Sequence, residues 1–145
     1  MRAWRHGHPQ SLLRSQVADE VGKQENMVVW SQITFTPVLL DAHVAPLQFS
    51  FYEKQQFPSA YWHGAFVAEH GSWNRRVRAG YQVVFVPFRN DTSADKPMSF
   101  FSGFVPSPIG KEVYGRPVGV AIAADGSLLI SDDAAKIIWR VSYSP

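Results

Sequence analysis

The chain has 145 residues, 46% of them hydrophobic, and a formal net charge of +2. That is enough for one compact domain with its own core, and the absence of Cys excludes disulfides and thiolate metal sites. No apolar run is long enough to span a bilayer. The one basic cluster, at residues 75–78, is weak support for a nucleic-acid partner, because a solvated loop or an anionic small ligand explains it as well.

Residues 1–35 form the segment of the chain that is hardest to interpret. Residues 1–8 lack the apolar core of a signal peptide, which taken alone predicts a cytoplasmic protein. Apolar residues at helical spacing within 11–27 predict a short amphipathic helix that ends near Gly22. Residues 28–35 are β-branched and aromatic and predict a strand. His6 and His8 lack a third ligand, so no metal site is predicted there.

The central part of the chain predicts a run of β-strands joined by turns. Four segments have strand patterns, in which apolar residues either alternate with polar ones or form a short run. These segments are 47–52, 65–68, 81–88 and 98–104. Pro58, a polar cluster at 89–96 and a Pro- and Gly-containing stretch after 104 separate or end them. Four successive strands with little helix predict an antiparallel meander.

The same pattern then restarts. Residues 116–122 repeat the position of 45–49, and Asp125-Gly126 is a tight hairpin signal between two apolar runs. Residues 126–133 parallel 64–71, which places Asp132 at the position of His70, and 136–143 predict a third strand. Repeated four-stranded units predict an all-β fold, a partial β-propeller of about two antiparallel blades. Because blades bury their faces against neighbours, we expect part of a larger propeller or a chain that self-associates.

The segment 64–75 is the strongest candidate for a binding site. It begins as a buried strand and ends in a loop that offers a carboxylate, an imidazole, a hydroxyl, an indole, an amide and a guanidinium. Ligand-binding groups are often placed on loops at the ends of rigid strands. The alternative is a polar surface turn with one packed Trp.

Several long segments of this sequence resemble the PQQ-dependent sorbosone/glucose dehydrogenase family, whose members use pyrroloquinoline quinone. The resemblance covers about residues 36–143 and rests on segments 42–47, 64–75, 80–88, 101–104, 115–121 and 125–133. It implies a six-bladed propeller, of which residues 36–145 would be the C-terminal blades. It also implies a sugar substrate, PQQ with Ca²⁺ in the complete fold, and export to the periplasm or the medium.

The resemblance also implies a cofactor pocket at the top of the propeller axis. It places Arg116 near PQQ, with His70, Trp73, Asn74 and Arg75 in the equivalent loop of the preceding unit. Arg binds carboxylates in bidentate geometry, and an indole packs against a planar ring. Two alternatives stay open: Arg116 pairs with one of the aspartates at 132 and 133, or Trp73 belongs to the core.

The resemblance covers only part of the family's active site. The catalytic His and the calcium-binding loop have no counterpart here, so no catalytic or metal-binding residue is predicted. Asp132 and Asp133 are oxygen ligands by type, but nothing places them at a metal. His43 either faces the same mouth or is a hydrogen-bonded structural His. The expected function is a fragment of a PQQ-dependent sugar dehydrogenase that is inactive alone; the alternative is a non-catalytic binding or oligomerisation module.

Overall fold

The computed structural model describes residues 38–89, 93–94 and 96–144. The helix expected within 11–27, the strand expected at 28–35 and the two N-terminal His residues lie outside them. The single helical element among the described residues is a 3₁₀ turn, η1 (Ser59–Tyr61). None of the described residues forms a helix long and apolar enough to cross a membrane.

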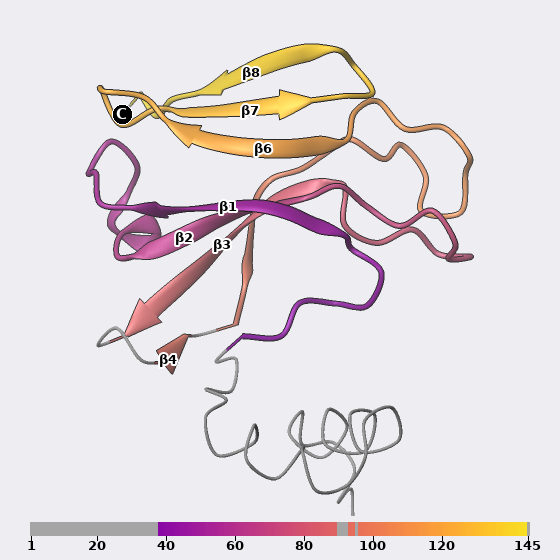
Figure 1. Cartoon of the computed structure of the whole chain (residues 1–145), viewed down its shortest axis with the longest axis horizontal. Helices are drawn as coiled ribbons and strands as arrows, with labels where there is room; N and C mark the ends of the chain where they lie inside the picture. Colours follow the sequence, from indigo (N-terminus) through magenta and orange to yellow (C-terminus); the bar gives the residue numbers. More distant parts are fainter. Residues whose placement is uncertain (1–37, 90–92, 95, 145) are drawn as a thin grey trace, which may run out of the picture. The chain divides into compact units, whose positions relative to one another are not determined.

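The first sheet is an antiparallel meander. Its main strands are β1 (Pro46–Tyr52), β2 (Gly64–Glu69), β3 (Gln82–Arg89) and β5 (Met98–Phe101) (Figure 1). The short β4 (Ser93–Ala94), which was not expected, pairs with the end of β3. The fourth expected strand ends at residue 101 rather than 104. Gly103 has a φ of 103°, a left-handed conformation that does not continue a strand.

The second sheet has three antiparallel strands, β6 (Pro117–Ile122), β7 (Leu128–Asp132) and β8 (Ile137–Val141). The expected hairpin turn joins β6 to β7, with Gly126 N donating to Ala123 O at 2.9 Å. One all-β unit of two sheets is therefore observed, and the predicted fold class is confirmed.

The strand register shows how the two units repeat. Pro46 pairs with Glu69 and Pro117 pairs with Asp132, and each Pro is followed by a register shift typical of a β-bulge. The predicted match of 116–122 with 45–49 is therefore confirmed. The predicted match of Asp132 with His70 is wrong by one residue, because Gly64 begins β2 whereas Gly126 lies in a turn before β7. His70 instead corresponds to Asp133.

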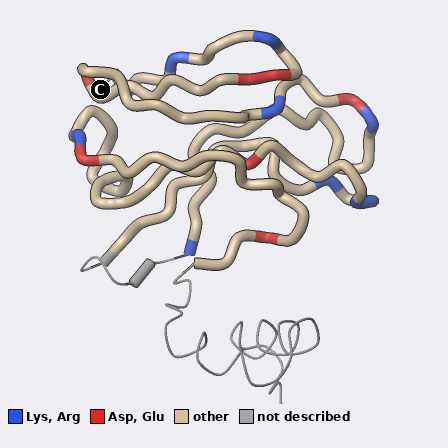
Figure 2. Tube along the Cα trace, in the orientation of Figure 1, with Lys and Arg blue, Asp and Glu red and all other residues tan. Residues whose placement is uncertain are grey.

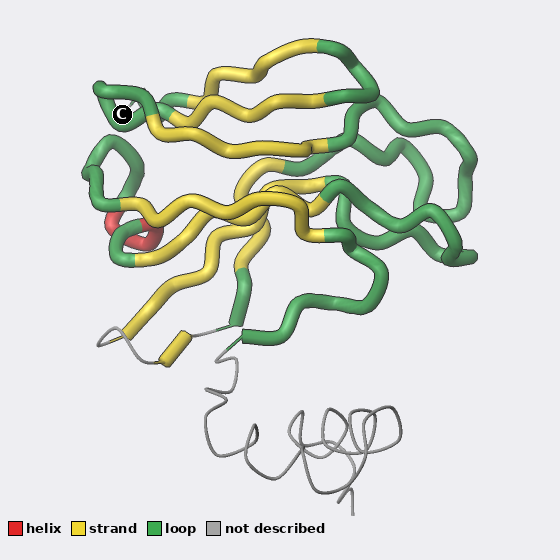
Figure 3. Tube along the Cα trace, viewed as in Figure 1, coloured by secondary structure: helices red, strands yellow, loops and turns green. Residues whose placement is uncertain are grey.

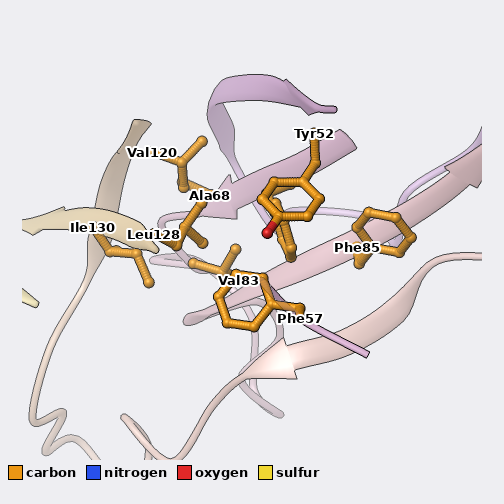
Figure 4. Packing of buried hydrophobic residues seen from close by; sticks show 9 residues of the cluster. Tyr52, Phe57, Ala68, Val83, Phe85, Val120, Leu128 and Ile130 are labelled. Atoms are coloured by element: carbon orange, nitrogen blue, oxygen red, sulfur yellow. The ribbon is translucent and has the colours of Figure 1, made fainter. Parts of the chain in front are cut away.

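The core lies between the two sheets, which pack as neighbouring blades. β6 lies against β1 and β2. Buried side chains of both sheets and of the β1–β2 connection meet there (Figure 4): Tyr52, Phe57, Phe66, Ala68, Val83, Phe85, Val120, Leu128 and Ile130. Aromatic rings fill the part nearest the first sheet, with the Phe66 and Phe85 centroids 5.0 Å apart. This core fixes the sheets against each other and so sets the spacing of the loops at their ends.

The other face of β1 is apolar and exposed. Phe49 and Phe51 alternate with residues that point toward the second sheet, and they are 62% and 58% exposed. Their rings contact each other edge to face, and Phe51 also contacts Phe88. The described residues therefore leave one blade face without a partner, as the repeat pattern predicts.

Four connecting segments gather at one end of the two sheets (Figure 3). They are the segment before β1, the loop between β2 and β3, the loop before β6 and the turn after β7. The connection from β1 to β2, which contains η1, and the turn between β6 and β7 lie at the other end. We call the first of these ends the rim.

Candidate functional site

Backbone hydrogen bonds hold the rim loops to one another. His70 N donates to Ala45 O at 3.0 Å, and Asp133 N donates to Arg116 O at 3.4 Å. Arg78 N donates to Pro108 O at 2.7 Å, which ties the β2–β3 loop to the loop before β6. Charged residues are concentrated on these loops (Figure 2). The rim is therefore one connected surface rather than a set of independent turns.

Arg116 lies where the two sheets meet at the rim. Its Nε donates to His70 O at 3.3 Å and its Nη2 donates to Gly71 O at 3.2 Å. The guanidinium carbon is 5.2 Å from the centre of the Tyr81 ring. Among the described residues its guanidinium forms no ion pair with a carboxylate. The half-buried guanidinium is therefore neutralised by no neighbouring carboxylate, which suits it to bind an anion.

The aspartates near Arg116 do not neutralise it. Asp132 accepts a hydrogen bond from the backbone N of Arg116 at 2.9 Å, not from the guanidinium. Asp133 instead lies against His70, whose Nε2 is 3.0 and 3.1 Å from the two carboxylate oxygens. The alternative in which one of them pairs with the Arg116 side chain is wrong. The His70–Asp133 contact joins equivalent positions of the two sheets.

Asp132 is a structural residue. Its Oδ1 also accepts from Ala135 N at 2.9 Å, and its Oδ2 accepts from Trp139 Nε1 at 3.1 Å. Burial alone would raise the pKa of this carboxyl, but the hydrogen bonds from Ala135 N, Arg116 N and the Trp139 indole hold the pKa below its usual value. The described residues contain no group of three or more His, Asp or Glu suited to a metal ion.

Trp73 and Asn74 lie at the exposed tip of the β2–β3 loop. Trp73 is 84% exposed, so the alternative that places it in the core is wrong. Neither side chain has a hydrogen-bond partner among the described residues, so both are free for a ligand. His43 is also exposed, with a φ of 66° and no side-chain hydrogen bond in this part of the chain, which does not support a structural role.

Arg75 is engaged elsewhere on the rim. Its Nη1 donates to Asp41 Oδ2 at 3.0 Å and to Ala42 O at 2.9 Å. The hydrogen bond from Arg75 holds the pKa of Asp41 below its ordinary value. Arg75 also lines a groove of about 470 Å³ with Glu69 and Gln82, and neither His70 nor Arg116 belongs to its lining. The structure thus brings His70 and Arg116 together but places Arg75 beside a different hollow.

Tyr81 is the main residue of this rim that sequence reasoning missed. It is 2% exposed, its hydroxyl donates to Ser72 O, and it accepts from Arg78 Nη1 at 2.7 Å. The one feature of the sequence that relates to it is the glycine at position 71. The structure explains that glycine, because a Cβ there would lie 2.4 Å from the Tyr81 ring. Asp41 and Asp133, the partners of Arg75 and His70, were not foreseen in those roles.

The TrAA12-like family model matches residues 14–144. The match therefore begins earlier than residue 36, at which the resemblance seen in the sequence motifs was expected to begin. An uncharacterized protein of Borreliella burgdorferi is 41% identical over 105 residues, which is 72% of this chain and 27% of that protein.

Two solved structures share the fold. The holo form of the PQQ domain of pyranose dehydrogenase from Coprinopsis cinerea has a TM-score of 0.62 at 25% identity, and it matches 86% of this chain and 33% of that one. The calcium structure of a carbohydrate-active enzymes family AA12 protein from Trichoderma reesei has a TM-score of 0.52 at 26% identity, over 67% and 24%.

The chain spans between about a quarter and a third of the length of these relatives. Its family model covers nearly all of the sequence, and its two sheets superpose on PQQ-domain folds. The chain belongs to the TrAA12-like family, and it resembles part of the PQQ domain of a pyranose dehydrogenase.

Proposed function

We propose that this chain supplies part of the PQQ-binding rim of a sugar oxidoreductase. Arg116 and His70 would lie at the centre of that site, with Trp73 and Asn74 from the same loop as His70. The observation that carries the proposal is the Arg116 guanidinium, which is held by the carbonyls of His70 and Gly71 and lacks a carboxylate partner among the described residues. The holo PQQ domain among the structural relatives supports the same ligand class.

The residues at the rim fit the chemistry of PQQ, a flat quinone with three carboxylates. A guanidinium without a counter-ion binds a carboxylate through charge-assisted hydrogen bonds. The exposed indole of Trp73 offers a face for a planar ring, and the free amide of Asn74 offers donors. Arg75 fits least well, because it already donates to Asp41, so we assign it a secondary role.

Bound PQQ would supply the two-electron acceptor for oxidation of a sugar CH–OH or aldehyde group. The residues of this chain would bind and orient it. Arg116 would hold a carboxylate, and the contact of His70 Nε2 with Asp133 would fix the orientation of the imidazole. No residue among those described is assigned as the base that removes the substrate proton.

We also propose that the chain alone does not turn over sugars. It spans a third of the PQQ domain that it matches, so most of that domain has no counterpart here. The complete protein would act on an aldose or on sorbosone, would use Ca²⁺ with PQQ, and would be periplasmic or secreted. Dye reduction with aldoses in the presence of PQQ and Ca²⁺ tests this, and robust turnover by the 145-residue chain would refute it.

PQQ binding tests the site itself. We expect PQQ to quench tryptophan fluorescence of the chain with a measurable Kd, and Arg116→Gln to raise that Kd about tenfold, the effect of losing one charged hydrogen bond. Arg76→Gln is the matched control, because Arg76 is an exposed cation of the same loop. An unchanged Kd for Arg116→Gln, or an equal loss for Arg76→Gln, would reject the proposed site.

A second function, self-association, is favoured by the exposed apolar face of β1. Phe49 and Phe51 leave a continuous aromatic surface that a second copy could cover. Light scattering should then give a dimer mass that the double change Phe49→Ser and Phe51→Ser reduces to that of a monomer. A monodisperse monomer of the unchanged chain would rule this function out.

A further inference from the structure

We infer that Tyr81 is a positioning residue for the anion site, by which we mean the Arg116 guanidinium and the carbonyls of His70 and Gly71 that hold it. Tyr81 contacts both the guanidinium and the loop that carries those carbonyls. The inference rests on the proposed PQQ-binding function and extends it to a residue buried beneath the rim. Tyr81 touches no ligand in this arrangement. It acts through Arg116.

The Tyr81 ring lies beside two cations. The guanidinium carbon of Arg116 is 5.2 Å from the ring centre, and that of Arg78 is 5.5 Å away. Both distances fall within the range of cation–π attraction, which is stronger where the ring is shielded from water. Because Tyr81 is 2% exposed, its ring is a fixed surface that limits where the Arg116 side chain can lie.

The same ring supports the loop that Arg116 binds. A Cβ on Gly71 would lie 2.4 Å from the Tyr81 ring, so the ring packs directly against this backbone. The Tyr81 hydroxyl donates to Ser72 O, one residue further along the loop. Gly71 O in turn accepts from Arg116 Nη2 at 3.2 Å. One side chain therefore positions both partners of this hydrogen bond.

The backbone of Tyr81 is unusual for its type. Its φ is 57°, in the left-handed region that bulky residues rarely adopt. Such conformations persist where the surrounding structure requires them, and they are concentrated at ligand sites. Tyr81 directly precedes β3. Its left-handed backbone accompanies the side-chain orientation that places the ring beneath the rim loop.

The consequence for binding is a guanidinium with defined free donors. Arg has five N–H donors, and among the described residues Arg116 uses one on His70 O and one on Gly71 O. The remaining three have no hydrogen-bond partner among the described residues, so a carboxylate would find donors there. Without the ring, the guanidinium would be free to adopt other rotamers, and the site would lose its preference for charged ligands.

The test compares Tyr81→Leu, which removes the ring, with Tyr81→Phe, which removes only the hydroxyl. We expect the Kd for PQQ to rise about tenfold in Tyr81→Leu and less than threefold in Tyr81→Phe. The uncharged trimethyl ester of PQQ should bind the unchanged chain and Tyr81→Leu with equal affinity. A purely structural defect would weaken both ligands alike, and that result would overturn the inference.

A double-mutant cycle separates this inference from the proposed function. In an Arg116→Gln background, Tyr81→Leu should cause no further loss of PQQ affinity, because both changes remove the same contact. If Arg116→Gln alone has no effect, the proposed function fails. If Arg116→Gln weakens binding but Tyr81→Leu does not, or if their losses add fully, the positioning role fails.

A measurement on the unchanged chain covers the case in which Tyr81→Leu does not fold. The NMR resonance of the Arg116 Nε–H should show a ring-current shift, and it should keep that shift in Tyr81→Phe. Absence of the shift in the unchanged chain would contradict the inference without any variant at position 81.

Discussion

Two buried carboxyls at equivalent positions of the two sheets behave in opposite ways. Glu69 ends β2 opposite Pro46, and Asp132 ends β7 opposite Pro117. Each is 3% exposed. Burial raises the pKa of Glu69, and the single hydrogen bond from Gln82 does not offset that rise. Burial would also raise the pKa of Asp132, but several hydrogen bonds to its carboxylate lower the pKa by more.

The comparison shows that hydrogen bonds to Asp132 outweigh the effect of burial on its pKa, whereas burial prevails over the single hydrogen bond to Glu69. The donors of Asp132 come from the residue before β6, the turn before β8 and β8 itself, so this carboxylate closes the rim end of the second sheet. Equivalent backbone bonds join the rim loops at both sheets, His70 N to Ala45 O at the first and Asp133 N to Arg116 O at the second, so the Asp132 bonds are additional to them. We therefore expect the fold to depend more on Asp132, which accepts three hydrogen bonds, than on Glu69, which accepts one from Gln82.

The largest expected effect is the loss of the Asp132 carboxylate. Asp132→Ala leaves Arg116 N, Ala135 N and Trp139 Nε1 without their acceptor. Each unsatisfied donor costs about 1–3 kcal/mol, so we expect a loss of about 4 kcal/mol in the free energy of unfolding, measured in urea. Asp133→Ala is the control, since its exposed pair with His70 contributes at most about 1 kcal/mol. Equal losses would contradict the comparison.

The next effect concerns the residue at which the two rim loops diverge. Gly71 follows His70, and the equivalent position of the second sheet is Ala134. Gly71→Ala places a Cβ 2.4 Å from the Tyr81 ring at a φ of 100°, so overpacking and backbone strain together should cost about 3 kcal/mol.

Gly103→Ala separates these two causes. Its φ of 103° is similar, but no atom lies within 4 Å of the added Cβ. Strain alone should cost about 1 kcal/mol there. Thermal unfolding of both variants measures the difference, and a loss for Gly103→Ala as large as that for Gly71→Ala would show that the Tyr81 contact contributes little.

A smaller effect, of opposite sign, is expected at Glu69. Its pKa is raised in the folded chain, so the folded state binds its proton more tightly than the unfolded state does. Its contribution is most favourable below the unfolded pKa near 4 and declines as pH rises through the folded pKa. Glu69→Gln should therefore be neutral near pH 4 and stabilising by up to about 1 kcal/mol at pH 8, measured by urea unfolding. Destabilisation at pH 8 would contradict this reasoning.

The fold was largely predictable because alternation and turn signals are local properties. The four strands of the first unit, the hairpin at Asp125-Gly126 and the repeat of Pro46 at Pro117 were all predicted from short windows. The one-residue error in matching His70 arose because Gly64 and Gly126 have different backbone roles. Glycine alone does not fix the register of a repeat.

The site was predictable only in part. The convergence of the His70 and Arg116 segments was expected, and the structure places them within hydrogen-bond distance. Pairings between distant segments could not be predicted, such as Arg75 with Asp41, which is 34 residues away. The position of Tyr81 depends on a left-handed backbone that no sequence pattern announces for an aromatic residue.

The smallest expected effect lies at the opposite end of the sheets, in the turn between β6 and β7. The Ser127 hydroxyl, the Ser127 N–H and Arg140 lower the pKa of Asp125 to about 2. The stabilisation from this charge is present above the unfolded pKa near 4 and is lost as pH falls through about 2. Asp125→Asn keeps an acceptor for Ser127 but removes the charge, so it should lower Tm by a few degrees at most at pH 6, and by nothing below pH 2. A Tm difference that is constant from pH 6 to pH 2 would mean that the amide disturbs the turn geometry rather than the charge.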